Sequence, residues 1–166
     1  AKEMPEALRA IGRKTVKAFR VTNRFVHLEY FRLDRPRKNL GEAGDFVALE
    51  VNMRPAGGYT PDMINYAHST DVYRIWADMV AFGRSDLEAS SGEREEYYCA
   101  FASRRDIYRY VHSHGEILEK YGETMVMCER MPDIMSGAMG NQMYTVRLKT
   151  EEEKDEFIRF VHEKIQ

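Results

Sequence analysis

The sequence lacks most of the features that would place it in a specialised class of protein. Among 166 residues there are only two cysteines, Cys99 and Cys128, too few and too far apart for a disulfide framework or a CxxC motif. No apolar run approaches the roughly 18 residues that cross a bilayer, and the first residues lack the apolar segment of a secretory signal. These absences argue against a membrane partner and predict a cytoplasmic protein with two free thiols.

The sequence also lacks an excess of charge of either sign. Lys and Arg number 25, Asp and Glu number 27, and no block of five like charges occurs. Nucleic-acid-binding surfaces concentrate basic residues, so we expect no nucleic-acid partner. The hydrophobic share of 43% and charged share of 31% are typical of a globular protein. The length suits one ordinary domain or two small ones.

The first half of the chain predicts helices around a two-stranded hairpin. Apolar residues at helical spacing predict a first helix, and the segments 24–33 and 46–54 predict strands. The polar, turn-rich loop 34–45 between them favours antiparallel pairing. Thr60 is expected to cap a helix whose first residue is Pro61, and another helix is expected to begin near Thr70 and Asp71.

The second of these helices is predicted to end at Gly83. Its apolar stripe, which includes Trp76 and Val80, is predicted to be core.

The second half predicts a different unit. The polar segment 84–96 is expected to be a linker between a domain at 1–83 and a small α+β subdomain at 97–166. Thr150 with Glu153 forms the capping box of a final helix. The other expected elements are strands at 97–103, 123–131 and 142–149, a helix through 107–121 interrupted near Gly115, and a plain connection at 131–144.

Three polar residues alternate along the second predicted strand. Glu50, Asn52 and Arg54 are spaced two apart, so their side chains share one face, and Glu29 lies on the neighbouring strand. Carboxylate and amide oxygens suit Mg²⁺, and a guanidinium can hold a phosphate or carboxylate. The alternative is a solvated face of an antiparallel sheet, which is common. His27, two residues before Glu29, is either a hydrogen-bond partner of that carboxylate or a half-buried strand residue.

A glycine turn follows this strand. Gly57 and Gly58 would let the backbone come close to a ligand. The predicted helix N-terminus at Thr60 would favour an anion. Together with the alternating strand, the segment indicates a site for metal-bridged phosphoryl groups.

The motifs HLEYF (27–31), LEVNMRPAGGYTPDM (49–63) and STDVYRIWADMV (69–80) resemble the C-terminal half of the ATP-grasp fold. This superfamily includes biotin carboxylases, the large subunit of carbamoyl phosphate synthase and other carboxylate–amine ligases. The resemblance covers about half of the chain and implies an antiparallel sheet with flanking helices.

The resemblance also implies roles for individual residues. Glu29, Glu50 and Asn52 would hold Mg²⁺ or Mn²⁺ that bridges the phosphates of ATP, with Gly57 and Gly58 beside the nucleotide. Arg54 would be the catalytic residue on the acyl-phosphate side. The implied activity is ATP-dependent ligation of a carboxylate substrate to an amine or thiol through an acyl phosphate.

An ATP-grasp enzyme also needs an N-terminal lobe with a lysine and a glycine-rich flap, and no such loop precedes Glu29. We therefore expect a C-terminal fragment, or one product of a split protein, that is inactive without that missing lobe. The alternative is a non-catalytic binding or oligomerisation module, which could pair as a homodimer through an exposed apolar face.

Overall fold

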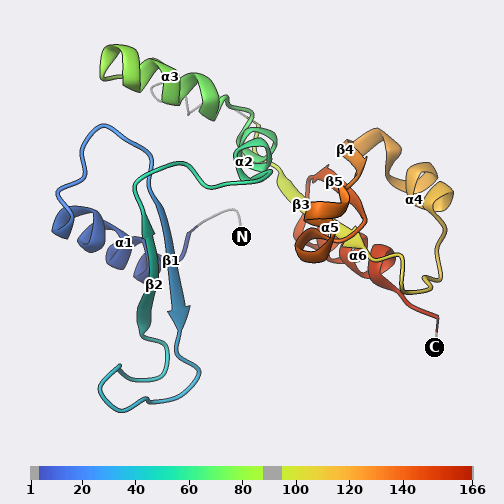
Figure 1. Cartoon of the computed structure of the whole chain (residues 1–166), viewed down its shortest axis with the longest axis horizontal. Coiled ribbons are helices and arrows are strands. Elements are labelled where there is room, and N and C mark those ends of the chain that lie inside the picture. Colours follow the sequence, from blue (N-terminus) through green and yellow to red (C-terminus); the bar gives the residue numbers. More distant parts are fainter. Residues whose placement is uncertain (1–3, 88–94, 166) are drawn as a thin grey trace. The chain divides into compact units, whose positions relative to one another are not determined.

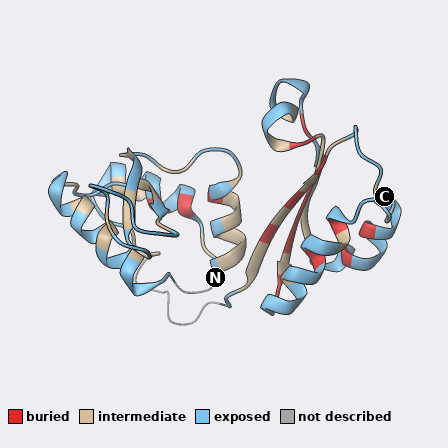
Figure 2. Cartoon of the chain, turned by 90° about the horizontal axis from the view of Figure 1, so that it is seen from below, coloured by how far each residue is buried: buried red, intermediate tan, exposed pale blue. Residues whose placement is uncertain are grey.

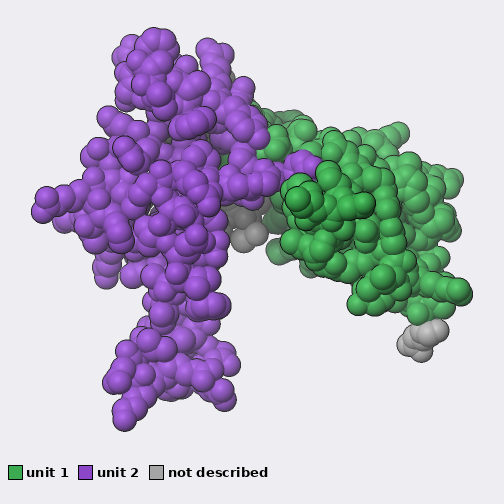
Figure 3. All heavy atoms as spheres, in the orientation of Figure 1, with its two compact units in different colours: residues 1–2, 62–70, 93–166 green, residues 3–61, 71–92 purple. Residues whose placement is uncertain are grey.

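The computed structural model describes residues 4–87 and 95–165. It divides into two compact units, coloured green and purple in Figure 3. Unit 1 comprises Ala1–Lys2, Asp62–Thr70 and Glu93–Gln166, and unit 2 comprises Glu3–Pro61 and Asp71–Gly92. The division differs from the predicted one because Asp62–Thr70 groups with the C-terminal sequence. Residues 88–94 of the predicted linker lie outside the described residues.

Unit 2 contains a helix and a two-stranded antiparallel hairpin (Figure 1). The helix is α1 (Glu6–Ala18), and the strands are β1 (His27–Arg32) and β2 (Phe46–Asn52). The predicted hairpin is confirmed, with both strands shorter than expected. Leu33 and Asp45 close its end through the Leu33 N–H, which donates to the Asp45 carbonyl at 2.9 Å.

One face of the hairpin packs on α1. The Tyr30 hydroxyl donates to Thr15 Oγ1 at 2.7 Å, and the Tyr30 ring meets the Phe46 ring edge-on with centroids 6.4 Å apart. A Cβ added at Gly12 of α1 would lie 4.0 Å from Leu28. Because side chains alternate along a strand, Leu28 and Tyr30 face α1, while His27 and Glu29 face away from it.

Unit 2 also contains α3 (Val72–Phe82), which begins and ends as predicted. Asp71 caps it by accepting from the Arg74 N–H, and Gly83 ends it at φ +70°. The prediction that its whole apolar stripe is core is wrong. Val72 and Ile75 are buried, but Trp76 is 47% exposed and Val80 74% exposed. Only one side of α3 is therefore covered by the described residues.

Unit 1 is built on a three-stranded antiparallel sheet of order β3–β5–β4. Its elements in the second half of the chain are β3 (Tyr98–Arg104), α4 (His114–Tyr121), a short 3₁₀ turn (Gly122–Thr124), β4 (Met125–Arg130), α5 (Asp133–Met139), β5 (Gln142–Leu148) and α6 (Glu151–His162). The α2 helix (Thr60–His68) begins at the residue predicted to cap it, one position before the predicted first residue, and its residues from Asp62 onward belong to this unit. The Tyr97 N–H donates to the Ala67 carbonyl of α2 at 2.8 Å.

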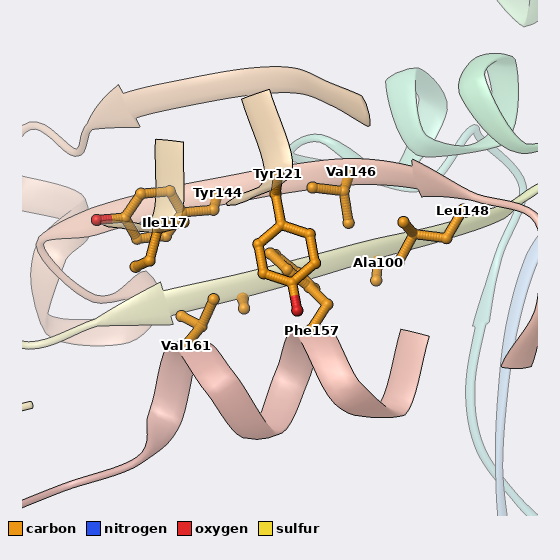
Figure 4. Packing of buried hydrophobic residues seen from close by; sticks show 9 residues of the cluster. Ala100, Ile117, Tyr121, Tyr144, Val146, Leu148, Phe157 and Val161 are labelled. Atoms are coloured by element: carbon orange, nitrogen blue, oxygen red, sulfur yellow. The ribbon is translucent and has the colours of Figure 1, made fainter. Parts of the chain in front are cut away.

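The sealed core of the protein lies in unit 1. α4 and α6 cover one face of the sheet, with Ile117, Val146, Phe157 and Val161 fully buried (Figure 4). The Tyr121 ring meets Phe157 edge-on at 5.1 Å between centroids. Buried residues, red in Figure 2, gather in the sheet and helices of this unit.

Unit 2 buries far less of its sequence. Among its described residues only Pro61, Val72 and Ile75 are buried, and α1, described throughout, buries none of its residues. A two-stranded hairpin with such shallow packing is marginally stable by itself. We therefore expect unit 2 to unfold more easily than unit 1.

Two local predictions in unit 1 need correction. The helix expected through 107–121 begins only at His114, because Ser113 and Glu116 form a capping box that sets its start. Gly115 therefore lies in the first turn of α4 and does not interrupt the helix. The segment expected to be a plain connection contains α5. The capping box of Thr150 with Glu153 is confirmed at the start of α6.

Arg104 links the end of β3 to the end of α6. Its side chain is buried, with Nε donating to the Val161 carbonyl and Nη1 to the His112 carbonyl, both at 2.6 Å. The guanidinium lies 4.4 Å from the centre of the Tyr110 ring. Burial lowers the pKa of Arg104 below its ordinary value. Within the described ranges, no helix has the length and apolarity needed to cross a membrane.

Candidate metal and phosphate site

The hairpin register brings the predicted site residues together in cross-strand pairs. Glu29 on β1 lies opposite Glu50 on β2, and His27 lies opposite Asn52. Directly opposed residues on an antiparallel pair share a face, with Cβ atoms about 4.5–5.5 Å apart. The four side chains therefore form a polar quartet (His27, Glu29, Glu50 and Asn52) on the face away from α1.

A β-bulge borders the polar quartet. The register shifts between Glu29 and Tyr30, so Tyr30 pairs with Ala48, and Leu49 is the extra residue on β2. Uninterrupted alternation would put Val47 and Glu50 on opposite faces, and the bulge puts both on the face of the polar quartet. Bulges often re-aim side chains beside functional sites.

The two members of the polar quartet on β1 are in contact with each other. His27 Nε2 lies 3.3 Å from Glu29 Oε1, and the two side chains are 32% and 41% exposed. The other ring nitrogen, His27 Nδ1, is buried and has no hydrogen-bond partner in the described part of the chain, and the same is true of Asn52 Nδ2. Two buried polar atoms without partners lie on neighbouring positions of one face, which is unusual because buried polar groups are normally paired.

The donor chemistry of the polar quartet fits a divalent cation. Glu29, Glu50 and Asn52 supply oxygen ligands of the kind that Mg²⁺ and Mn²⁺ accept. No three His, Cys, Asp or Glu side chains are poised around one point among residues 4–87 and 95–165. A set of three oxygen ligands would therefore need the Asn52 amide and a rotation of the exposed Glu50 side chain.

Arg54 is not on the strand. β2 ends at Asn52, and Arg54 lies in a bend two residues further on, where its exposed Nη1 donates to the Pro55 carbonyl at 2.9 Å. The predicted alternation thus holds for Glu50 and Asn52 and stops before the arginine, because the Pro55 turn ends the strand.

The glycine turn after β2 is open. Gly58 has φ +60°, which favours glycine, whereas a Cβ at Gly57 or Gly58 would meet nothing within 4 Å. Asp62 lies in the first turn of α2, where a carboxylate already interacts favourably with the helix dipole. The predicted preference of this helix start for an anion is therefore weakened.

Sequence reasoning did not find the bulge or the pairing of His27 with Asn52. The register follows from the loop and the bulge together, and no residue in the strands signals a bulge at Leu49. The sequence did indicate that His27 and Glu29 share a face, because they are two residues apart on one strand, but it did not indicate which residues of β2 lie opposite them.

The fold matches part of an ATP-grasp enzyme. The structure is similar to phosphoribosylglycinamide synthetase from Anaerococcus prevotii, with a TM-score of 0.62 and 10% sequence identity. The match covers 94% of this chain and 39% of that enzyme, so the chain spans well under half of its length. Neither a protein-family model nor a curated protein sequence matches the chain. At this identity the likeness is one of fold.

Proposed function

We propose that the chain is part of an ATP-dependent carboxylate–amine or carboxylate–thiol ligase and supplies the strands that hold the metal-bound phosphates of ATP. The observation that carries the proposal is the polar quartet, which lies on the hairpin face away from α1. It is supported by the likeness to part of an ATP-grasp enzyme.

The proposed roles follow from the chemistry of each side chain. Glu29 and Glu50 supply carboxylate oxygens and Asn52 an amide oxygen to Mg²⁺ or Mn²⁺. Arg54, exposed and just beyond β2, can leave the Pro55 carbonyl and hold an acyl phosphate in its planar fork. Gly57 and Gly58 leave room for a ligand to approach the backbone.

MgATP would supply the phosphoryl group that activates the carboxylate substrate. The chain's own residues would hold the charged phosphates in position, which is the main task of the protein in phosphoryl transfer. Positioning by several groups at once is required, and this chain offers one side of such a site. We therefore expect the 166-residue chain alone to bind MnATP weakly and to form no measurable ADP.

Metal binding tests the proposal directly. Mn²⁺ titrated into the chain, with and without ATP, should lose its free-ion electron paramagnetic resonance signal as it binds. Asn52→Leu and Glu50→Gln should each abolish binding, and Glu42→Gln, which removes an exposed carboxylate from the loop of the same hairpin, should leave it unchanged. Equal binding by all four proteins would place the cation elsewhere and refute the proposed site.

A second candidate function is a binding or oligomerisation module without catalysis. The apolar residues exposed on α3 favour it, since Trp76, Val80 and Phe82 are 47%, 74% and 75% exposed. In this case the chain would form a concentration-dependent dimer in analytical ultracentrifugation. Val80→Ser with Phe82→Ser would make it monomeric, and Mn²⁺ would have no effect.

A further inference from the structure

His27 is the member of the polar quartet without an assigned role. Its ring touches Glu29 through Nε2 at 3.3 Å, and its register partner on β2 is Asn52. Two of the three residues proposed to hold the cation are thus neighbours of this one imidazole.

The two unpaired atoms are chemically complementary. A neutral imidazole that donates its Nε2–H to a carboxylate leaves Nδ1 as a hydrogen-bond acceptor. The Asn52 amide nitrogen can only donate. One buried acceptor and one buried donor, both unpaired in the described part of the chain, therefore occupy directly opposed positions, whose Cβ atoms are about 4.5–5.5 Å apart.

We propose that His27 is a positioning residue that joins Asn52 to Glu29. The Asn52 amide N–H donates to His27 Nδ1, and His27 Nε2–H donates to Glu29 Oε1. Nε2 and Oε1 are in contact at 3.3 Å in the structure, and modest side-chain rotations would close both of these hydrogen bonds. The inference depends on the proposed function, since it concerns how the same site orients its ligands.

The consequence for the cation is specific. Because the amide nitrogen and oxygen of Asn52 are attached to the same planar carbon, a hydrogen bond from the nitrogen to His27 would fix the direction in which the oxygen points, as a metal ligand requires. The same imidazole holds Glu29 by one oxygen and leaves the other oxygen for the metal. Partners of this kind typically change metal affinity by about 10–100-fold when they are removed.

The competing role for His27 is direct ligation of the metal through Nδ1. A nitrogen ligand would shift the preference of the site from Mg²⁺ toward transition metals. The positioning role is favoured because Nε2 already contacts Glu29 and because the unpaired atom across the strand is a donor.

The first test needs no variant. In the metal-free chain at pH 8, long-range ¹H–¹⁵N correlation of the imidazoles should show His27 with its proton on Nε2. A proton on Nδ1 would overturn the proposal, because that nitrogen could not then accept from Asn52.

The second test measures Mn²⁺ affinity by electron paramagnetic resonance. His27→Phe keeps a ring and removes both nitrogens, and should weaken Mn²⁺ binding at least tenfold. His27→Gln can donate to Glu29 and accept from Asn52 through one amide, and should stay within about threefold of the unchanged chain. His27→Phe binding as tightly as the unchanged chain, or His27→Gln binding as weakly as His27→Phe, would overturn the positioning role.

The failures of the two proposals can be told apart. If the unchanged chain binds no Mn²⁺ with or without ATP, the proposed function fails, while a proton on His27 Nδ1 would separately refute the hydrogen-bonded link. If the unchanged chain binds Mn²⁺ and the proton lies on Nδ1, only the link fails. Should His27→Phe not fold, as judged by Trp76 emission, the tautomer measurement and His27→Gln remain decisive.

Discussion

The pairing of Glu29 with Glu50 predicts that removing one proposed ligand stabilises the metal-free protein. The two residues are register partners on one face with Cβ atoms about 5 Å apart, and two like charges at about that separation in water repel by roughly 0.8 kcal/mol. Both side chains are substantially exposed, so salt reduces this value, and we expect Glu50→Gln to raise the free energy of unfolding of unit 2 by about 0.3–0.8 kcal/mol.

Added metal should reverse the order of stability. A ligand that binds only the folded state at one hundred times its dissociation constant stabilises that state by about 2.7 kcal/mol. The unchanged chain should therefore gain stability with saturating Mn²⁺ and overtake Glu50→Gln, which should gain none.

Trp76 provides the assay. It is the single tryptophan of the chain and lies on α3 in unit 2, the unit that contains the hairpin. Urea unfolding followed by its fluorescence thus reports on unit 2, and Glu42→Gln serves as a control for loss of one negative charge. If Glu50→Gln is less stable than the unchanged chain without metal, or gains as much stability from Mn²⁺, the assignment of this carboxylate is wrong.

Unit 1 supports four further predictions. Phe157→Ala, at a fully buried position, should destabilise the unit by about 3–5 kcal/mol in urea unfolding followed by circular dichroism. Thr150→Ala, which removes the cap of α6, should cost about 1 kcal/mol in the same assay. The hydrogen bond from Arg130 lowers the pKa of Asp106. The ionised carboxylate therefore stabilises the folded protein at neutral pH, and this contribution is lost as the pH falls through the lowered pKa. Asp106→Asn should thus reduce the loss of stability below about pH 4, measured by the same unfolding assay. Burial raises the pKa of Cys99 to about 11, so iodoacetamide at pH 8 should alkylate it slowly in the native protein and faster in urea, as followed by mass spectrometry.

Local sequence signals predicted much of the fold. Thr150 with Glu153, and Asp71 with Gly83, predicted helix ends because capping acts through nearby backbone groups. The start of α4 was missed because apolar spacing was extended through a turn that the capping box at Ser113 excludes.

What depends on distant contacts could not be predicted. The exposed side of α3 has the same apolar spacing as a helix face that is buried in a core. This spacing alone does not indicate whether other elements cover that side of the helix. In the candidate site, the two-residue spacing predicted that Glu50 and Asn52 share a face. The bulge at Leu49 and the pairing of His27 with Asn52 depend on how the two strands align, which the sequence of either strand does not indicate.

The two short hydrogen bonds from Arg104 have a practical consequence for shortening the protein. Its buried guanidinium donates to the carbonyl oxygens of Val161 and His112, and its Nη2 has no hydrogen-bond partner in the described residues. Deleting the chain from Phe160 onward would remove one of the two carbonyl acceptors of the buried Arg104 guanidinium. Removing the last turn of α6 should therefore lower the stability of unit 1 by more than the loss of so few residues suggests. A purification tag is better attached beyond Gln166 than put in place of this turn.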